Sequence, residues 1–407
     1  MKRLLYLCVA IAMLASCSNE IPEQEEASFN GRTILVYLVA NNASPTKLDE
    51  YLKTNVLWMY QNMATDSDSC RLLVYYRPSQ NDRLITEPSI LEFRSDGKGH
   101  INGRSALSTG EFSDVFGEAT VLRTYIETEG YNATDPEVMA QVFRDMQTAA
   151  PSQSYGLIFG SHASGWMPAS ATVSRAFGDD DGYSINIPEL RDVLTNSFSS
   201  GNLDFILLDA CMMGSVEVAY ELRNVADYCI ASVMETPASG FPYQRMFHYL
   251  SDTDVDYQRI CTAFTDYYQS GWGTCAAIDC SRLDNLADAV AGELQNHATD
   301  ISTLDYQNIQ QYGASSYRNF SFDIGDFFRQ LNGGTIPASI QTALDQAVIA
   351  KSCIPGKYNY LPEVDADRFC GIGMFFPEYT GRTISWEDYY RTSISWYQAV
   401  GWDGLLN

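Results

Sequence analysis

Positive charge is scarce in this chain of 407 residues. Lysine and arginine number 26 against 51 aspartate and glutamate residues, which gives a net charge of −25 at pH 7. Because proteins that bind nucleic acids neutralise phosphates with basic side chains, this balance argues against a nucleic-acid partner. The same balance is compatible with cationic ligands.

Metal-binding spacings are also absent from the sequence. The four histidines are scattered, and the ten cysteines form no Cys-x-x-Cys pair and no repeated spacing. Structural zinc sites depend on such spacings, so we expect no metal site and no required cofactor. The acidic stretch Asp179–Gly182 does offer the hard oxygen ligands that calcium prefers, although it does not follow the twelve-residue calcium loop.

The apolar run at the N-terminus, Leu4–Leu14, is too short to cross a membrane as a permanent helix. It follows two basic residues, so residues 1–16 are typical of a signal peptide. The run ends in Leu14-Ala-Ser-Cys17, which resembles a bacterial lipobox. This resemblance implies lipidation of Cys17, a polar tether over residues 17–31 and a lipid anchor in the cell envelope, at the outer membrane. An ordinary signal peptide with an incidental cysteine is the plain alternative.

Apolar runs and helical patterns alternate between residue 32 and about residue 300. Their order predicts an α/β fold, with a mostly parallel six-stranded sheet covered by helices on both faces. The pattern changes after residue 300, so we expect a main domain at 32–300, a smaller C-terminal α+β domain at 301–407, and a monomer. The expected strands are 33–40, 70–76, 155–161, 203–210, 228–234 and 274–279.

Two of these strands stop at a reactive side chain that small residues follow. One run ends in Gly-Ser-His162 and the other in Asp-Ala-Cys211. The carboxyl ends of parallel strands share one edge, so both side chains are expected there, one crossover apart. A histidine that takes the thiol proton makes the cysteine a nucleophile, and a helix start after Cys211 favours the thiolate. Packed core positions for both side chains are the plain alternative.

Two carboxylates accompany the predicted nucleophile. Side chains alternate along a strand, so Asp209 points to the same side as Cys211. It is expected to line a specificity pocket for arginine or lysine; alternatively, it caps the following helix or pairs with a base. Glu235 ends the next expected strand and is either a second pocket acid or a solvated loop charge.

Together these motifs resemble the clostripain family of cysteine endopeptidases, relatives of caspases, legumains and gingipains with a caspase-like α/β/α fold. The resemblance covers about residues 32–407 and includes Asp209-Ala-Cys-Met-Met-Gly214 and Gly371-Ile-Gly-Met-Phe-Phe-Pro377. It implies a dyad of His162 and Cys211, and peptide or protein substrates that are cut after arginine or lysine. It also implies that Asp209 is the pocket acid and that the oxyanion is held by the amides of Ala163 and Cys211.

One residue departs from the family pattern. The family usually has glycine after the catalytic histidine, where this sequence has Ala163. Alanine keeps the amide, but a positive φ at this position would cost about 1–2 kcal/mol. The family also implies self-cleavage in the loop after the histidine. Arg175 is the basic residue of segment 167–185 and the predicted cleavage site, with an intact surface loop as the alternative.

The competing function is a non-catalytic envelope lipoprotein that keeps the fold and binds peptides or a protein partner. Retention of both His162 and Cys211 counts against it, and Ala163 counts slightly for it. A peptidase that acts only on its own loop is a further alternative.

Overall fold

The computed structural model describes residues 32–66, 70–126, 130–169, 176–199, 203–313, 321–377 and 387–405. The predicted signal peptide, the tether with Cys17, and Arg175 lie outside these residues. Over the described ranges, no helix has both the length and the apolar composition needed to cross a bilayer.

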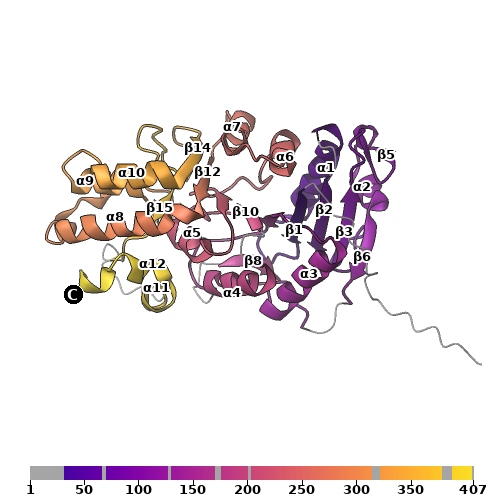
Figure 1. The fold of residues 1–407 in the computed structure, drawn as a ribbon, viewed down its shortest axis with the longest axis horizontal. Coiled ribbons are helices and arrows are strands. Elements are labelled where there is room, and N and C mark those ends of the chain that lie inside the picture. The colour runs from indigo at the N-terminus through magenta and orange to yellow at the C-terminus, as the bar shows by residue number, and fades with distance from the viewer. Residues whose placement is uncertain are drawn as a thin grey trace, which may run out of the picture.

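A nine-stranded sheet forms the centre of the described structure (Figure 1). Its five middle strands are parallel and carry the residues of interest, whereas the strands at both edges are antiparallel. In spatial order the strands are β14 (Val348–Cys353), β12 (Thr274–Asp279), β11 (Tyr228–Ala231), β10 (Leu203–Asp209), β7 (Tyr155–Gly160), β1 (Thr33–Val39), β2 (Arg71–Arg77), β3 (Ser89–Arg94) and β6 (Thr120–Thr124).

The α/β architecture is thus as predicted, but the sheet has nine strands among the described residues rather than six. The three additional strands, β3, β6 and β14, lie at the two edges. Two-stranded ribbons lie outside the large sheet: β4 (His100–Ile101) with β5 (Arg104–Ser105), β8 (Phe177–Asp180) with β9 (Tyr183–Ile185), and β13 (Phe322–Asp323) with β15 (Gly373–Met374).

Helices cover both faces of the sheet, which explains the nearly continuous apolar sequence of its parallel strands. In β1, Ile34, Val36 and Leu38 point into one hydrophobic core, whereas Leu35, Tyr37 and Val39 point into the other. The first core is closed by α1 (Asp49–Asp66), α2 (Phe112–Glu118), α6 (Tyr243–Ser251) and α7 (Tyr257–Tyr267). The second is closed by α3 (Pro136–Ala149), α4 (Ile187–Ser197), α5 (Val216–Leu222), α8 (Leu283–Asn296), α9 (Ile324–Leu331), α10 (Ala338–Ala347), α11 (Glu387–Ser393) and α12 (Ser395–Ala399).

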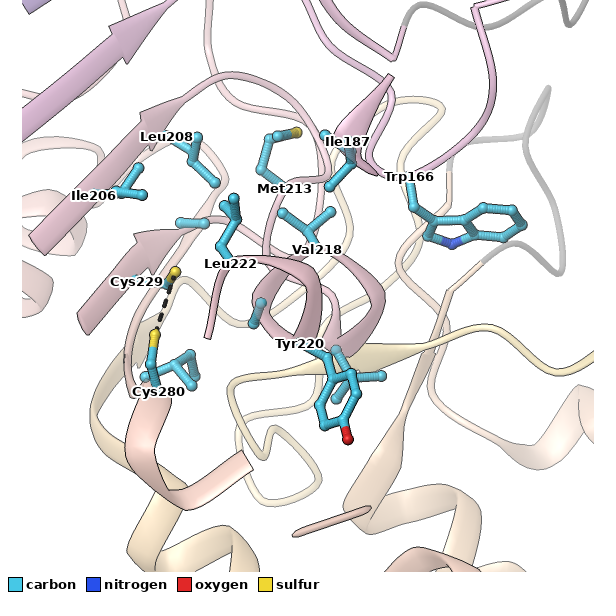
Figure 2. Packing of buried hydrophobic residues seen from close by; sticks show 14 of the residues in the cluster. Trp166, Ile187, Ile206, Leu208, Met213, Val218, Tyr220, Leu222, Cys229 and Cys280 are labelled. Carbon is cyan, nitrogen blue, oxygen red and sulfur yellow. Dashed lines mark hydrogen bonds between the residues drawn. The ribbon is translucent and has the colours of Figure 1, made fainter. Parts of the chain in front are cut away.

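Part of the second core is seen around α5 in Figure 2, where Val218 and Leu222 face Leu208 of β10. The chain after residue 300 joins this sheet and this core. Helix α10 ends at Ala347, and the chain continues directly as β14, which pairs with β12. The sheet therefore extends beyond the domain boundary that we expected near residue 300.

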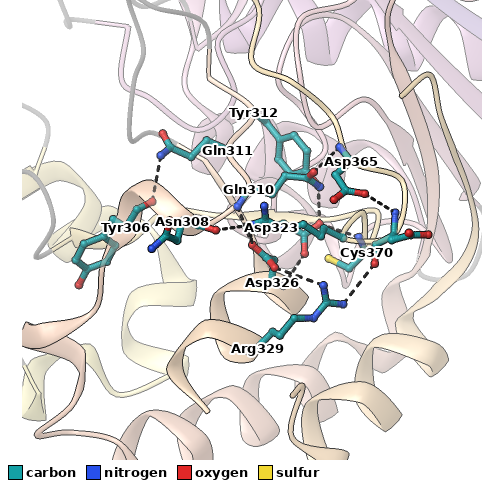
Figure 3. A network of polar contacts seen from close by, with 12 residues as sticks. Tyr306, Asn308, Gln310, Gln311, Tyr312, Asp323, Asp326, Arg329, Asp365 and Cys370 are labelled. Atoms are coloured by element: carbon teal, nitrogen blue, oxygen red, sulfur yellow. Dashed lines mark hydrogen bonds and ion pairs between the residues drawn. The ribbon is translucent and has the colours of Figure 1, made fainter. Parts of the chain in front are cut away.

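Two buried carboxylates hold the segment around residue 310 against α9 (Figure 3). Asp323 accepts hydrogen bonds from the backbone amides of Cys370 at 2.7 Å and Asp326 at 2.9 Å, and from the hydroxyl of Tyr312. Asp326 accepts from the amide of Gln310 at 2.8 Å. Buried acids are stable only when they are paired in this way, so the network fixes the path of the C-terminal third of the chain.

A third buried carboxylate, Glu217 in the first turn of α5, joins this helix to the C-terminal segment. Its Oε1 accepts from the amide of Phe375 at 2.7 Å and from the hydroxyl of Tyr390 at 3.3 Å. Burial raises the pKa of Glu217 to about 7. Because the folded state binds the proton more tightly than the unfolded state, this residue makes the protein less stable as the pH rises toward 7.

Replacing Glu217 by glutamine tests this assignment. Glutamine keeps an acceptor for the amide of Phe375 but cannot ionise, so Glu217→Gln should remove a stability loss of up to about 1.4 kcal/mol per pH unit between pH 5 and 7. Denaturant unfolding at pH 5, 6, 7 and 8 measures the difference from wild type. Glu137→Gln, at an exposed position of α3, is the matched control. A difference that stays constant with pH would contradict the raised pKa.

Candidate active site

The strand connections reverse direction at β1. From β1 the chain proceeds to β2, β3 and β6 on one side, and it returns to β7, β10, β11, β12 and β14 on the other. In open α/β sheets, ligands bind outside the carboxyl ends of the strands at such a point. A cavity of about 590 Å³ lies there, and its lining includes Thr46 after β1, His162 after β7, Cys211 after β10 and Glu235 after β11.

The structure brings five predicted site residues into the lining of this one cavity. They are His162, Ala163, Asp209, Cys211 and Glu235. The register of the two central strands explains why His162 and Cys211 line the same cavity. Gly160 of β7 lies opposite Asp209 of β10. His162 and Cys211 each follow that pair by two residues.

A tight turn presents the thiol of Cys211. The next residue, Met212, has φ of 61°, a left-handed conformation that is uncommon outside glycine and that gathers at functional sites. The amide of Met212 donates to the carbonyl of Met234 at 2.9 Å. A Cβ at Gly214 would lie 2.7 Å from backbone atoms of Ser232 and Val233, so only glycine fits where the turn crosses the neighbouring chain.

Cys211 is a neutral thiol in this structure. Burial, with smaller contributions from the carboxylates of Glu235 and Asp209, raises its pKa to about 12, although Sγ also accepts a hydrogen bond from the amide of Thr236 at 3.4 Å. Because α5 begins only at Val216, the sulfur does not lie at a helix N-terminus. The helix start expected directly after Cys211 is therefore not seen, and the sulfur needs a base to take its proton.

His162 is held by a backbone oxygen. Its Nε2 lies 2.9 Å from the carbonyl oxygen of Thr46. A carbonyl only accepts, so Nε2 carries the proton and Nδ1 is the basic nitrogen. Sequence reasoning missed this orienting group because it is a main-chain atom, which leaves no residue type to recognise.

The backbone at Ala163 suits the predicted oxyanion site. Ala163 is not among the described residues with positive φ, so the alanine brings no backbone strain. It lies opposite Phe177 in an isolated β-bridge whose hydrogen bonds involve the residues on either side of it. Within the described part of the chain, the amides of Ala163 and Cys211 donate no hydrogen bond, so both remain available to a ligand.

Asp209 forms the most buried acidic part of the cavity lining and is 6% exposed. Its carboxylate accepts from the amide of Phe241, 3.2 Å from both oxygens, and from the hydroxyl of Tyr243 at 2.9 Å. Burial raises the pKa of Asp209 to about 6. The alternative roles expected for it are not seen, because Ser215 caps α5 and these partners are not bases.

Gly240 covers the Asp209 carboxylate with bare backbone. It has φ of 70°, and a Cβ at this position would lie 2.5 Å from Oδ2 of Asp209. The wall of the cavity includes the apolar side chains of Leu48 and Leu52. Glu235 also belongs to the lining and accepts a hydrogen bond at 2.9 Å from the hydroxyl of Tyr360, a residue that is 59% exposed.

The acidic stretch considered for calcium is engaged by protein donors. Asp179 accepts from the amides of Ser44 at 3.1 Å and Gly182 at 2.9 Å. Asp180 pairs with Arg77 at 3.0 Å and accepts from the side chain of Asn41 at 2.6 Å. These residues therefore do not fit a calcium site. Across the described ranges, no three His, Cys, Asp or Glu side chains gather in a way that could hold a metal ion.

Comparisons with known proteins lead to one family. The model of the clostripain family matches residues 36–407. Clostripain of Hathewaya histolytica is 30% identical over 130 residues, which are 28% of this chain and 24% of that protein. This match therefore spans about a quarter of the curated relative.

Two solved structures share the fold over nearly the whole chain. A secreted C11 cysteine protease from Bacteroides thetaiotaomicron, in complex with an irreversible peptide inhibitor, is 26% identical with a TM-score of 0.72, over 92% of this chain and 99% of that one. An inactive zymogen C11 protease from Parabacteroides distasonis is 24% identical with a TM-score of 0.70, over 91% and 97%, and supports the fold alone. Since the family model spans almost the entire described structure, the chain belongs to the clostripain family of cysteine peptidases.

Proposed function

We propose that the protein is an endopeptidase that cuts after lysine or arginine through an acyl-enzyme on Cys211. The observation that carries this proposal is the shared cavity, which is lined by His162, Cys211 and a buried carboxylate two residues before the sulfur. Lysine and arginine have a long apolar stem and a charged head. The stem suits the wall formed by Leu48 and Leu52, and the head suits Asp209.

In the proposed reaction, Nδ1 of His162 takes the thiol proton while Sγ of Cys211 attacks the peptide carbonyl carbon. The amides of Ala163 and Cys211 donate to the oxygen that becomes negative. The C–N bond then breaks, and the imidazolium gives its proton to the leaving amine. Water, deprotonated by His162, cleaves the thioester and restores the thiol.

Lipidation of Cys17 and anchoring in the cell envelope are part of the same proposal. They are supported by the lipobox-like Leu14-Ala-Ser-Cys17, which lies outside the described residues. A monomer on an acyl anchor would meet peptide substrates at the membrane surface without spanning it.

Fluorogenic peptides ending in lysine, arginine or a neutral residue test the activity, with residues 18–407 of wild type beside Cys211→Ala. We expect turnover of the two basic peptides that is lost in the variant, because no other described cysteine lines the cavity. Binding of basic peptides without turnover in wild type would favour the non-catalytic lipoprotein instead.

The pocket role of Asp209 predicts a pH dependence. Asp209 is ionised above pH 6 and neutral below it, so the KM of basic peptides should rise as the pH falls through about 6, while the KM of neutral peptides should not. Asp209→Asn should lower kcat/KM for basic peptides by about 10- to 100-fold, the loss of one charge-assisted contact.

Folding provides the control for this variant. Because the folded-state pKa of Asp209 is raised, ionisation costs stability, and asparagine should leave the thermal midpoint at pH 7 unchanged or higher. An unaltered ratio of basic to neutral turnover in Asp209→Asn would rule out Asp209 as the pocket acid.

We also propose that the chain cuts itself after Arg175. Arg175→Ala should then leave one uncut polypeptide on a denaturing gel, as should Cys211→Ala, whereas Arg175→Lys should still be cut. Peptide turnover by uncut Arg175→Ala would show whether the cut is needed for activity. A cut that persists in Arg175→Ala would disprove this site.

A further inference from the structure

The loop after β1 is closed around one buried side chain. Asn42 is 4% exposed; its Oδ1 accepts from the amide of Leu48 at 3.1 Å, and its Nδ2 donates to the carbonyl of Thr46 at 2.6 Å. Of this loop, Ser44 and Thr46 belong to the described cavity lining, and Asn42 does not. Asn42 therefore fixes the shape of the cavity edge without facing the ligand space.

The carbonyl oxygen of Thr46 is shared by two donors. Nδ2 of Asn42 lies 2.6 Å from it and Nε2 of His162 lies 2.9 Å from it, and its two lone pairs can serve both. Nδ2 of Asn42 also lies 3.3 Å from Nε2 of His162, and an amide nitrogen can only donate, but the shorter 2.9 Å contact with the Thr46 carbonyl favours Nε2 as the protonated nitrogen. If Nε2 were unprotonated, its lone pair would point at a lone pair of the Thr46 carbonyl oxygen, and the two would repel. The loop thus selects the tautomer in which Nδ1 is the base.

The same loop is tied to the backbone of His162 through β8. The carboxylate of Asp179 accepts from the amide of Ser44 at 3.1 Å, and Asp179 is fully buried. One residue earlier, the amide of Gly178 donates to the carbonyl of His162 at 2.9 Å. One strand therefore ties the loop that carries the Thr46 carbonyl to the backbone of His162.

We propose that Asn42 is a positioning residue for His162, acting through the Thr46 carbonyl. This inference rests on the proposed dyad and adds the group that orients it. When Cys211 loses its proton, the imidazole becomes imidazolium, and the bond from Nε2–H to Thr46 becomes charge-assisted. A carbonyl held at this position therefore stabilises the pair of thiolate and imidazolium more than a loose loop would.

The test uses alkylation of the Cys211 thiol by iodoacetamide, a small neutral reagent that needs no specificity pocket. Rates are measured against pH for the full chain with wild-type sequence, Asn42→Ala, Asn42→Asp and His162→Ala. Cys211→Ala gives the background from the other cysteines. Asn62→Ala, the same change at a position of α1 away from the cavity lining, is the matched control.

We expect Asn42→Ala to slow alkylation at pH 7 about tenfold, the effect of one hydrogen bond of about 1.4 kcal/mol, and to move the acid limb of the rate to lower pH. Asn42→Asp should move that limb to higher pH, because a carboxylate can accept the Nε2 proton directly and favours the imidazolium. With peptide substrates, Asn42→Ala should lower kcat by a larger factor than it raises KM, since Asn42 holds the cavity edge but does not itself line the cavity.

A wild-type rate and an unmoved limb in both Asn42 variants would overturn the proposal. If Asn42→Ala does not fold, the direction of the limb in Asn42→Asp decides alone. Failure of the proposed function gives a different pattern, in which Asn42 affects alkylation as expected but no peptide is cut. A His162→Ala variant that alkylates like wild type would instead disprove the dyad itself.

Discussion

The hydrogen-bonded register between β7 and β10 is the constraint on which the site depends. Gly160 lies opposite Asp209, and this pairing brings the residues that follow each strand to the same height at the sheet edge. A shift by one residue would displace the two ends by about 3.3 Å and turn each side chain to the other face. Gly156 helps to fix the register, because a Cβ there would lie 2.3 Å from the ring of its partner Phe205.

Charge around the sulfur explains how the cavity can join recognition to chemistry. Burial is the main cause of the raised pKa of Cys211, and the carboxylates of Glu235 and Asp209 add to it. In the proposed reaction, a lysine or arginine head beside Asp209 offsets one of these negative charges, and the thiol becomes easier to deprotonate. A basic side chain is then both attracted by the two carboxylates and able to offset the rise that they cause in the pKa of Cys211. A neutral substrate would provide no such relief.

The parallel strands and the placement of His162 and Cys211 at one edge of the sheet could be predicted, because each motif combines a buried apolar run with an abrupt end. The edge strand β14 could not. Its sequence, Val-Ile-Ala-Lys-Ser-Cys, continues a helical pattern, and exposed Ile349 and Lys351 alternate with buried Ala350 only because β12 lies beside it. Propensity at an edge depends on the neighbour, which a local pattern does not contain.

Two further features of the site depend on contacts between distant segments. The thiolate was expected from a helix directly after Cys211, but the left-handed turn at Met212 delays that helix to Val216, and burial then decides the protonation state. The orienting group of His162 is a carbonyl in a loop that precedes it by more than a hundred residues. Asn42, which holds that loop, is one polar residue among many in the sequence and becomes distinctive only through its partners.

The two turns of the site come from different crossovers, and the C-terminal segment provides support that they share. Trp166, in the turn after His162, packs its ring 5.1 Å from Phe375 and 4.6 Å from Tyr390. Glu217, in the helix after Cys211, accepts hydrogen bonds from the same two residues. Aromatic packing on one side and a buried carboxylate on the other therefore hold both turns against one surface. The residues after position 300 thus contribute to the geometry of the site although none of the predicted site residues lies among them.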